Sequence, residues 1–257
     1  LAAQTSGEDS QTNALNDIKN NAYVTLKVAN FAKFKNIPKF VYMSTSAIYG
    51  SSCTSIVNED SSLAPDSVYG VSKYSGELFI KQVFKGTSTK YTIFRLTNSF
   101  GPGENINYNK KGMVSIFSGM VWRQEEILVK GSLDRIRNFL YVKDVIRALL
   151  MTDKKESDNE IFLLSSGKKT SVGELINCII KAFNVEYNYP INVAKQRTSG
   201  DTDVFHADTE KINNQLGWRP HYSLEAGLKE YVDWIRKVPV GTKDLESYHP
   251  FNLRERK

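Results

Sequence analysis

Residues 39–50 read Lys-Phe-Val-Tyr-Met-Ser-Thr-Ser-Ala-Ile-Tyr-Gly. The run from Lys39 to Met43 is apolar after its lysine and predicts a buried strand, which ends in the hydroxyl side chains of Ser44, Thr45 and Ser46. A hydroxyl at the carboxyl end of a parallel strand faces the crevice in which open α/β sheets bind ligands. The stretch therefore predicts an α/β fold with a ligand site at the end of this strand.

Residues 69–73 read Tyr-Gly-Val-Ser-Lys, so a phenol and an ammonium share one face at the start of a predicted helix. A tyrosine, whose pKa is about 10, acts as a base near neutrality only where something stabilises its phenolate, and a cation one turn away does so. The same spacing occurs at Tyr23 and Lys27, which no comparable strand precedes. We interpret the Tyr23 pair as structural and the Tyr69–Lys73 pair as a candidate catalytic acid and base.

Composition indicates one globular unit or two closely joined lobes, because 257 residues with 40% apolar side chains can bury a sizeable core. The sequence has no apolar run near the roughly 20 residues of a membrane span and no signal peptide, which predicts a cytoplasmic protein. Cys53 and Cys178 form no framework, and His206, His221 and His249 have no metal-ligand spacing. The net charge of +6 is spread along the chain, so we expect neither nucleic acid nor a membrane as a partner.

Residues 1–103 alternate predicted helices and strands, as βαβ units do. Leu1-Ala2-Ala3-Gln4 resembles the end of a buried strand, so the chain is expected to start within a fold. The other predicted elements are a helix from Asn13 to Lys35, the strand at Lys39, a polar loop to Ser67, the Tyr69 helix to about Phe84, a strand from Tyr91 to Leu96 and a turn sequence from Asn98 to Gly103.

Residues 104–257 predict a smaller α/β lobe that covers the crevice, with residues 138–152 returning to the main sheet. The predicted elements are a helix from Met113 to Arg123, strands at Ile127–Val129 and Asn138–Tyr141, a helix from Val142 to Met151, a strand at Glu160–Leu164, a helix to Phe183 that the capping box of Ser171 and Glu174 opens, and a final helix from Ser223 to Lys237.

Several motifs follow one another along nearly the whole chain in the order and spacing of one family. They are Leu1-Ala2-Ala3-Gln4, Asn21 with Thr25, Thr45, Tyr69-x-x-x-Lys73, Arg95-x-x-Asn98-x-Phe100-Gly101-Pro102-Gly103, Arg137-Asn138-Phe139-Leu140-Tyr141-Val142-x-Asp144, and Ala207-Asp208 through Leu216-Gly217-Trp218-x-Pro220. On these residues the chain resembles an extended short-chain dehydrogenase/reductase of the NAD-dependent nucleotide-sugar epimerase/dehydratase family. It departs from the family pattern at Val24, where glycine is usual, and at Phe100, which replaces tyrosine.

The resemblance implies a Rossmann-type doubly wound parallel sheet whose second half occupies residues 1–103, followed by a substrate-binding lobe. It implies catalytic roles for Thr45, Tyr69 and Lys73, with Lys73 lowering the Tyr69 pKa. It further implies cofactor contacts from Leu1, Ala2, Ala3, Asn20, Ser44, Tyr69, Lys73 and Thr97, and contacts with a nucleotide-diphosphate sugar from Thr45, Asn98, Lys130, Arg137 and Arg197. Arg197 stands one residue too early before Gly200 for the family's second arginine.

The family's Gly-x-x-Gly-x-x-Gly loop does not occur before Leu1, so we expect the chain to be a fragment, a processed product or an incompletely recorded sequence. NAD is carried over from the family, and NADP stays open because the residue that separates the two belongs to the same absent part. A truncated, non-catalytic relative that binds a nucleotide sugar is one alternative reading.

The residues after Thr45 bear on the reaction. Family members that eliminate water usually have Asp-Glu at this place, whereas here Ser46-Ala47 follows, which disfavours a dehydratase. The resemblance therefore favours a UDP-hexose 4-epimerase with enzyme-bound NAD, and an NAD(P)H-dependent keto-sugar reductase is the alternative. By the same resemblance we expect a homodimer formed by the Asn13–Lys35 and Tyr69 helices, and a role in polysaccharide biosynthesis.

Overall fold

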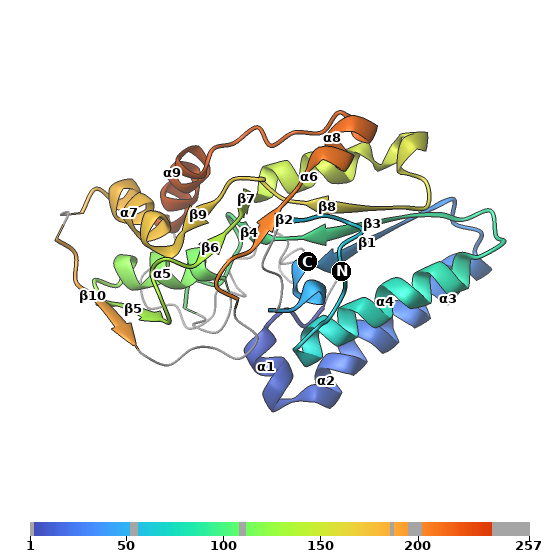
Figure 1. The fold of residues 1–257 in the computed structure, drawn as a ribbon, viewed down its shortest axis with the longest axis horizontal. Helices are drawn as coiled ribbons and strands as arrows, with labels where there is room; N and C mark the ends of the chain where they lie inside the picture. Colours follow the sequence, from blue (N-terminus) through green and yellow to red (C-terminus); the bar gives the residue numbers. More distant parts are fainter. Residues whose placement is uncertain (1–2, 52–55, 108–111, 186–187, 195–201, 238–257) are drawn as a thin grey trace, which may run out of the picture.

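The computed structural model describes residues 3–51, 56–107, 112–185, 188–194 and 202–237. They form a parallel sheet with helices on both faces, beside a second lobe built mainly of helices (Figure 1). None of the helices in these ranges has the length and apolar character that crossing a bilayer requires. The same ranges hold no cluster of His, Cys, Asp or Glu suited to a metal ion. Cys53 and His249 lie outside them.

The main sheet contains β1 (Lys39–Thr45), β3 (Lys90–Leu96) and β8 (Glu160–Leu164), all parallel in the order β1-β3-β8. The central strand β3 is buried from Thr92 to Arg95, because helices cover both of its faces. The parallel α/β fold predicted from the sequence is confirmed. Residues 138–152, which were predicted to return to the main sheet, precede β8, and β8 belongs to that sheet. The chain therefore crosses between the two lobes more than once.

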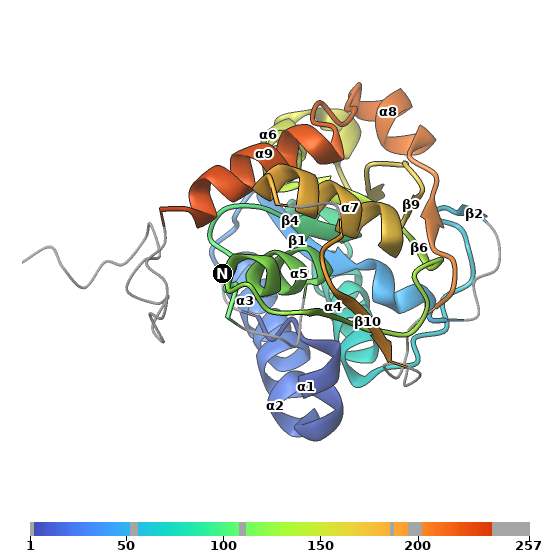
Figure 2. The same cartoon turned by 90° about the vertical axis from the view of Figure 1, so that its left-hand side faces the viewer.

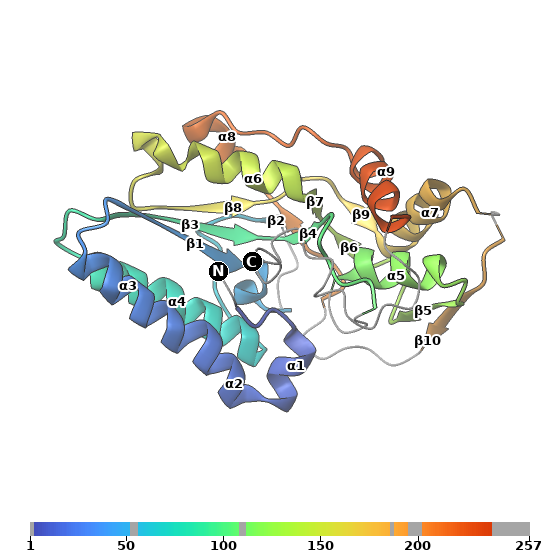
Figure 3. The ribbon, with the colours of Figure 1, turned by 180° about the vertical axis from the view of Figure 1, so that it is seen from behind.

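Two layers of helices enclose this sheet (Figures 1 and 3). On one face α3 (Val24–Phe34) and α4 (Val68–Phe84) pack side chains such as Ala29, Ile80 and Phe84 against Tyr42 and Ile93. On the other face α6 (Val142–Leu150) and α8 (Glu210–Leu216) bury a cluster around Phe94, Phe162 and Trp218. The predicted helix from Tyr69 to Phe84 is confirmed, whereas α8 was not predicted.

The predicted helix from Asn13 to Lys35 is confirmed, because helical residues run without interruption from Ala14 to Phe34 and include one π-helical turn. The structure has α1 (Gly7–Thr12), α2 (Ala14–Ile18), a π-helical turn (Lys19–Tyr23) and then α3. Asn13 ends the first helix in a non-helical conformation, and its side chain accepts a hydrogen bond from the Asn16 backbone at 3.2 Å, so it caps the second helix. Helix α1, which ends before Asn13, was not predicted.

Short strands form two-stranded pairs outside the main sheet. The expected turn at Asn98 begins with β4 (Asn98–Phe100), which pairs in parallel with β7 (Phe139–Tyr141). Inside the expected polar loop, β2 (Ile56–Val57) pairs with β11 (His206–Ala207). The remaining pairs are β5 (Ile127–Lys130) with β10 (Ile191–Ala194), and β6 (Ile136–Arg137) with β9 (Thr170–Ser171).

The second lobe has its own core between α5 (Met113–Trp122), α7 (Val172–Phe183) and α9 (Leu224–Ile235). In Figure 2, α7 and α9 lie side by side with α5 below them. The predicted capping box at Ser171 and Glu174 is confirmed, with both of its hydrogen bonds present. Short 3-10 turns occur at Ser46–Tyr49, Met151–Asp153 and Lys155–Ser157.

Candidate active site

The predicted hydroxyl and phenol meet where β1 ends and α4 begins. Thr45 is the last residue of β1 and is buried, and its side chain lies near the Tyr69 phenol, where it favours the ionised form. The Thr45 hydroxyl also accepts a hydrogen bond from the Ala47 backbone at 3.2 Å. Ser67 caps α4 through the Gly70 backbone at 3.0 Å, which places Tyr69 in the first turn of the helix. The strand end and the helix start therefore present two hydroxyls to one point.

Lys73 follows one turn later on the same helix and is 6% exposed. Its ammonium lies over the ring of Tyr42, 4.3 Å from the centroid, and the Tyr42 hydroxyl donates to the Lys73 carbonyl oxygen at 3.3 Å. Burial lowers the pKa of Lys73 to about 8, while the negative charges of Glu77 and Asp17 oppose this shift. Lys73 is thus held inside the site by Tyr42 with a pKa unusually close to neutrality.

The pKa of Tyr69 is raised above its ordinary value of 10.0 by burial and by the charge of Asp17, against the hydrogen bond from Thr45. Lys73 was expected to lower this pKa. It does not do so without bound ligands, because its ammonium lies on the Tyr42 ring. Tyr69 is therefore a protonated phenol at neutral pH in this structure. The Tyr23 pair is different, since Lys27 lies over a Tyr23 ring that is 49% exposed at the surface.

The predicted cofactor contacts are only partly brought together. Ser44 is buried at the end of β1, and its hydroxyl has no hydrogen-bond partner within the described residues. Thr97 is buried after β3 and donates to the Leu164 carbonyl oxygen at 3.4 Å. Asn20 instead donates to the Asn16 side chain at 3.0 Å, on the outside of the helix. Ala3 is exposed, and Leu1 and Ala2 lie outside the described residues.

These positions fit a dinucleotide. The carboxyl ends of β1 and β3, on which Ser44 and Thr97 stand, point towards the second lobe (Figure 1). Parallel sheets bind dinucleotides at such an edge, and a buried hydroxyl without a partner there is suited to a polar ligand. Ser44, Thr97, Tyr69 and Lys73 are therefore the described residues that would hold one.

Apart from Thr45, the predicted substrate contacts within the described residues stand on β4, β5 and β6, outside the main sheet. Asn98 donates from its side chain to the Asn138 carbonyl oxygen at 3.4 Å. Arg137 is 5% exposed, and its guanidinium donates to the carbonyl oxygens of Ile136 at 2.7 Å and Thr202 at 2.6 Å. The half-exposed Lys130 on β5 pairs with Glu8 of α1 at 3.7 Å, so this ion pair links the second lobe to the N-terminal helix. Arg197 lies outside the described residues.

Sequence reasoning missed a buried polar cluster beside the tyrosine. Asp17, Asn21 and Ser72 are each at most 1% exposed and hydrogen-bond to one another. Nearby, the Ser10 hydroxyl accepts a hydrogen bond from the Tyr69 backbone at 3.1 Å. The spacing of four residues between Asp17 and Asn21 was the available signal, because it puts both on one helical face.

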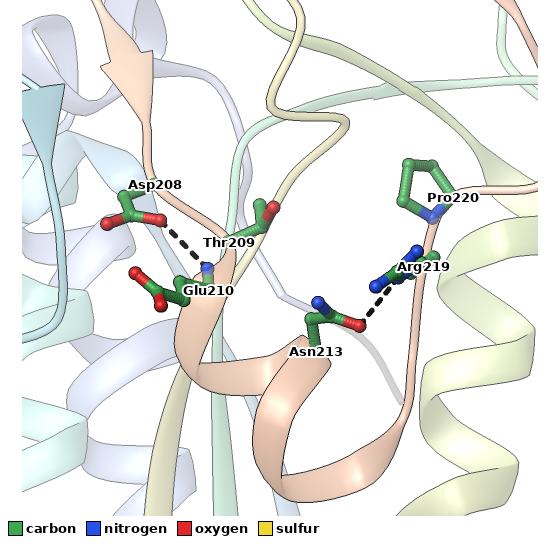
Figure 4. A pocket seen from close by; sticks show the side chains of 6 residues that line it. All are labelled: Asp208, Thr209, Glu210, Asn213, Arg219 and Pro220. Carbon is green, nitrogen blue, oxygen red and sulfur yellow. Dashed lines mark hydrogen bonds between the residues drawn. The ribbon is translucent and has the colours of Figure 1, made fainter.

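A shallow hollow of about 420 Å³ lies elsewhere, around α8 (Figure 4). Asp208 accepts from the Glu210 backbone at 2.8 Å, and Arg219 donates to the Asn213 side chain at 2.7 Å, so each of these side chains has a hydrogen-bond partner within the hollow. Since α8 and α4 cover opposite faces of the sheet, this hollow is separate from the site around Tyr69.

Comparison with known proteins gives consistent matches over most of the chain. The sequence model of the GDP-mannose 4,6-dehydratase family matches residues 1–231. A putative UDP-glucose 4-epimerase of Methanocaldococcus jannaschii is 32% identical over 91% of this chain and 75% of the relative. The dTDP-4-dehydro-6-deoxyglucose reductase of Escherichia coli is 27% identical over 92% and 73%. The UDP-glucose 4-epimerase of Thermotoga maritima, solved with UDP-glucose, superposes with a TM-score of 0.86 at 33% identity, covering 92% and 76%.

Proposed function

Because the chain belongs to the nucleotide-sugar epimerase/dehydratase family of extended short-chain dehydrogenases/reductases, we propose that it is a UDP-hexose 4-epimerase. The observation that carries the proposal is the approach of the Thr45 side chain to the Tyr69 phenol, with Lys73 one turn further along the same helix. The similarity to two UDP-glucose 4-epimerases supports the choice of substrate. The cofactor we propose is NAD, as in the family.

The residues of the site have complementary roles in this reaction. Tyr69 takes the proton of the sugar 4-hydroxyl as the 4-carbon is oxidised, and it returns that proton when the carbon is reduced on its other face. NAD, when bound, accepts the hydride and gives it back, so no exchange of cofactor is required. Thr45 hydrogen-bonds the reacting oxygen and holds it next to the phenol. Lys73 supplies positive charge, which favours the phenolate once the ammonium moves from the Tyr42 ring.

The diphosphate of the substrate requires donors and positive charge, which Arg137, Asn98 and Lys130 provide around the crevice. Arg137 is already oriented by two backbone carbonyl oxygens, so little conformational entropy is lost when it meets a phosphate. Lys130 has to exchange Glu8 for the ligand, and at 3.7 Å on a half-exposed surface that ion pair is weak.

The test is inversion at C4. Purified protein is incubated with UDP-glucose and NAD, and formation of UDP-galactose is followed by proton NMR. Tyr69→Phe removes the only group proposed to carry the proton, so the rate should fall at least a hundredfold, the lower bound of about 10²-fold for general acid–base catalysis. The matched control is Tyr23→Phe, which alters the other Tyr-x-x-x-Lys pair on the surface and should leave the rate unchanged.

Three results would contradict this assignment. The first is equal loss of activity in both variants, and the second is full activity of Tyr69→Phe. The third is a wild-type protein that inverts neither UDP-glucose nor UDP-N-acetylglucosamine.

A keto-sugar reductase is the second candidate, and the similarity to the Escherichia coli reductase favours it. It uses the same hydroxyl, phenol and ammonium, but it consumes a reduced cofactor with each turnover. Stoichiometric oxidation of added NADPH with a 4-keto sugar, without C4 inversion of UDP-glucose, would identify the reductase. A product lighter by one water would identify a dehydratase, which Ser46-Ala47 after Thr45 disfavours.

We also propose a homodimer through α3 and α4. Large apolar side chains are exposed on this side, among them Phe31 at 60%, Phe34 at 77% and Leu78 at 47%. Phe31→Asp should yield a monomer in analytical ultracentrifugation, whereas Leu150→Asp, at a 73% exposed apolar position on α6, should leave the dimer intact. A monomeric wild type would contradict the proposal. A cytoplasmic location and a role in polysaccharide biosynthesis stay predictions.

A further inference from the structure

Asp17 is a carboxylate in an unusual place. It is 0% exposed at the end of α2, and no ion pair within the described residues includes it. Burying a carboxylate without a cationic partner costs several kcal/mol, so sequences retain one mainly where it has a task. The proposed reaction does not use Asp17.

Its hydrogen bonds connect Asp17 to the turn of α4 that carries the catalytic pair. Ser72 donates to one carboxylate oxygen of Asp17, and Asn21 donates to the other at 3.2 Å. Asn21 also donates to the Ser72 hydroxyl at 3.2 Å, and that hydroxyl lies 3.0 Å from the Tyr69 carbonyl oxygen. Ser72 stands between Tyr69 and Lys73 in the chain. Asp17 is therefore connected to the turn that carries Tyr69 and Lys73 through the Ser72 side chain.

The local backbone is built to make this contact. Asp17 lies two residues before the π-helical turn Lys19–Tyr23, and Asn21 lies within that turn. Such turns are rare, geometrically unfavourable and frequent at functional sites. Here the turn accompanies two polar side chains, four residues apart, that both face α4. The apolar side chains Ile18 and Tyr23 of the same segment are exposed.

The charged and titratable groups around the pair come from several elements. On α4 these are Lys73 and Glu77, and on β1 it is Tyr42. Helix α1 packs against the start of α4 and carries Glu8 and Asp9 in its first turn. Beside these groups, the negative charge of Asp17 raises the pKa of both Tyr69 and Lys73.

We propose that Asp17 is a positioning residue of this site: its carboxylate fixes the turn from Tyr69 to Lys73 and, by its charge, keeps the Lys73 ammonium protonated at the pH of the reaction. The proposal rests on the proposed function, because it assumes that Tyr69 and Lys73 carry the chemistry. Its first consequence, the protonation of Lys73, is measurable without substrate or cofactor.

The experiment compares Lys73 in the wild type and in Asp17→Asn. Protein labelled with ¹³C at the lysine Cε is titrated by NMR from pH 6 to pH 10, and the Lys73 signal is assigned by its absence in Lys73→Met. The wild-type midpoint is expected near the pKa of about 8, and removal of the negative charge should move it to lower pH. The variant is conservative, because Asn21 has an unpartnered side-chain oxygen and can turn its amide to meet the new one.

The matched control is Asp144→Asn. Asp144 is also 0% exposed and accepts backbone hydrogen bonds from His221 at 2.9 Å and Tyr222 at 3.0 Å, but it lies on α6 across the sheet. It should cost stability without moving the Lys73 midpoint. A midpoint in Asp17→Asn at or above that of the wild type overturns the proposal, since a merely structural role predicts no downward shift.

Two further measurements keep the test decisive. Asp17→Asn should lower kcat roughly tenfold with little change in KM, as misplaced positioning groups do. If that variant does not fold, Ser72→Ala is used instead. It retains the Asp17 charge but removes the hydrogen bond that joins Asp17 to α4, so the Lys73 midpoint should stay at the wild-type value while kcat falls. Unchanged kcat in Ser72→Ala overturns the proposal. Failure of the proposed function is seen separately, as a wild type that does not invert UDP-hexoses.

Discussion

Replacing Glu77 by glutamine tests how much the buried ion pair between α4 and β3 stabilises the fold around the site. Glu77 on α4 receives two parallel hydrogen bonds from the Arg95 guanidinium on β3, at 3.2 and 3.0 Å. Arg95 is 3% exposed and Glu77 0%, and Arg95 also donates to the Tyr49 hydroxyl at 3.0 Å and the Glu59 carbonyl oxygen at 2.8 Å. Glu77→Gln keeps the shape but leaves the arginine charge buried without a counter-charge.

The expected loss of stability is about 3–5 kcal/mol, the cost of removing one partner from a buried ion pair. For a chain of this size each kcal/mol lowers the melting temperature by about 2–4 °C, so the shift should be about 6–20 °C. Differential scanning calorimetry at neutral pH measures it directly. Activity measured well below the melting temperature also reports whether the altered α4 still presents Tyr69.

The control is Glu125→Gln, because Arg123 binds Glu125 with the same two-pronged geometry, at 2.9 and 2.8 Å, on the surface. The Glu125 side chain is 50% exposed, so water and salt screen the pair and its loss should cost under about 1 kcal/mol. Equal shifts for the two variants, or a loss below about 1 kcal/mol for Glu77→Gln, would refute the argument from burial.

Three further changes test particular contacts. Lys73→Met should stabilise the fold at pH 7 by up to about 3 kcal/mol, because burial lowers the Lys73 pKa from 10.5 to about 8. The buried ammonium is charged below pH 8 and neutral in both the folded and the unfolded protein above pH 10.5, so the gain in melting temperature should shrink between pH 7 and pH 10. A gain that stays constant over this range would contradict the assignment. Gly76→Ala would place a methyl 2.3 Å from the Tyr42 hydroxyl oxygen and should cost about 1–3 kcal/mol in urea unfolding, against Gly7→Ala, which meets nothing within 4 Å. Ser171→Ala removes the N-cap of α7 and should cost about 1 kcal/mol in the same assay; no loss would mean that the capping box adds nothing.

Elements defined by strong local signals were predicted well from the sequence. The strand Glu160–Leu164 and the capping box at Ser171 agree with the structure because each depends on a few neighbouring residues. The helix from Asn13 to Lys35 was predicted with its bounds, but its π-helical turn was not, because that turn depends on packing against α4. The strands β10 and β11 were missed because their partners lie far away in the chain.

The candidate site shows the same division. Sequence spacing selected Tyr69 and Lys73, the family resemblance added Thr45, and the structure places Thr45 against Tyr69. Spacing could not show that the Lys73 ammonium lies on the Tyr42 ring, or that Asn20 faces outwards. Both depend on how helices pack on the sheet, which local patterns describe only as an apolar face.

The sequence by itself determined which chemical groups the protein has and which of them share a helical face or a strand end, because those relations follow from the fixed geometry of helices and strands. Only the tertiary structure decided which charged groups lie close to them. Asp17 and Ser72 are separated by 55 residues, yet their side chains are hydrogen-bonded inside the protein. Burial strengthens electrostatic interactions by excluding water, so such a contact shifts the pKa of Tyr69 and Lys73 in ways that no local sequence pattern encodes.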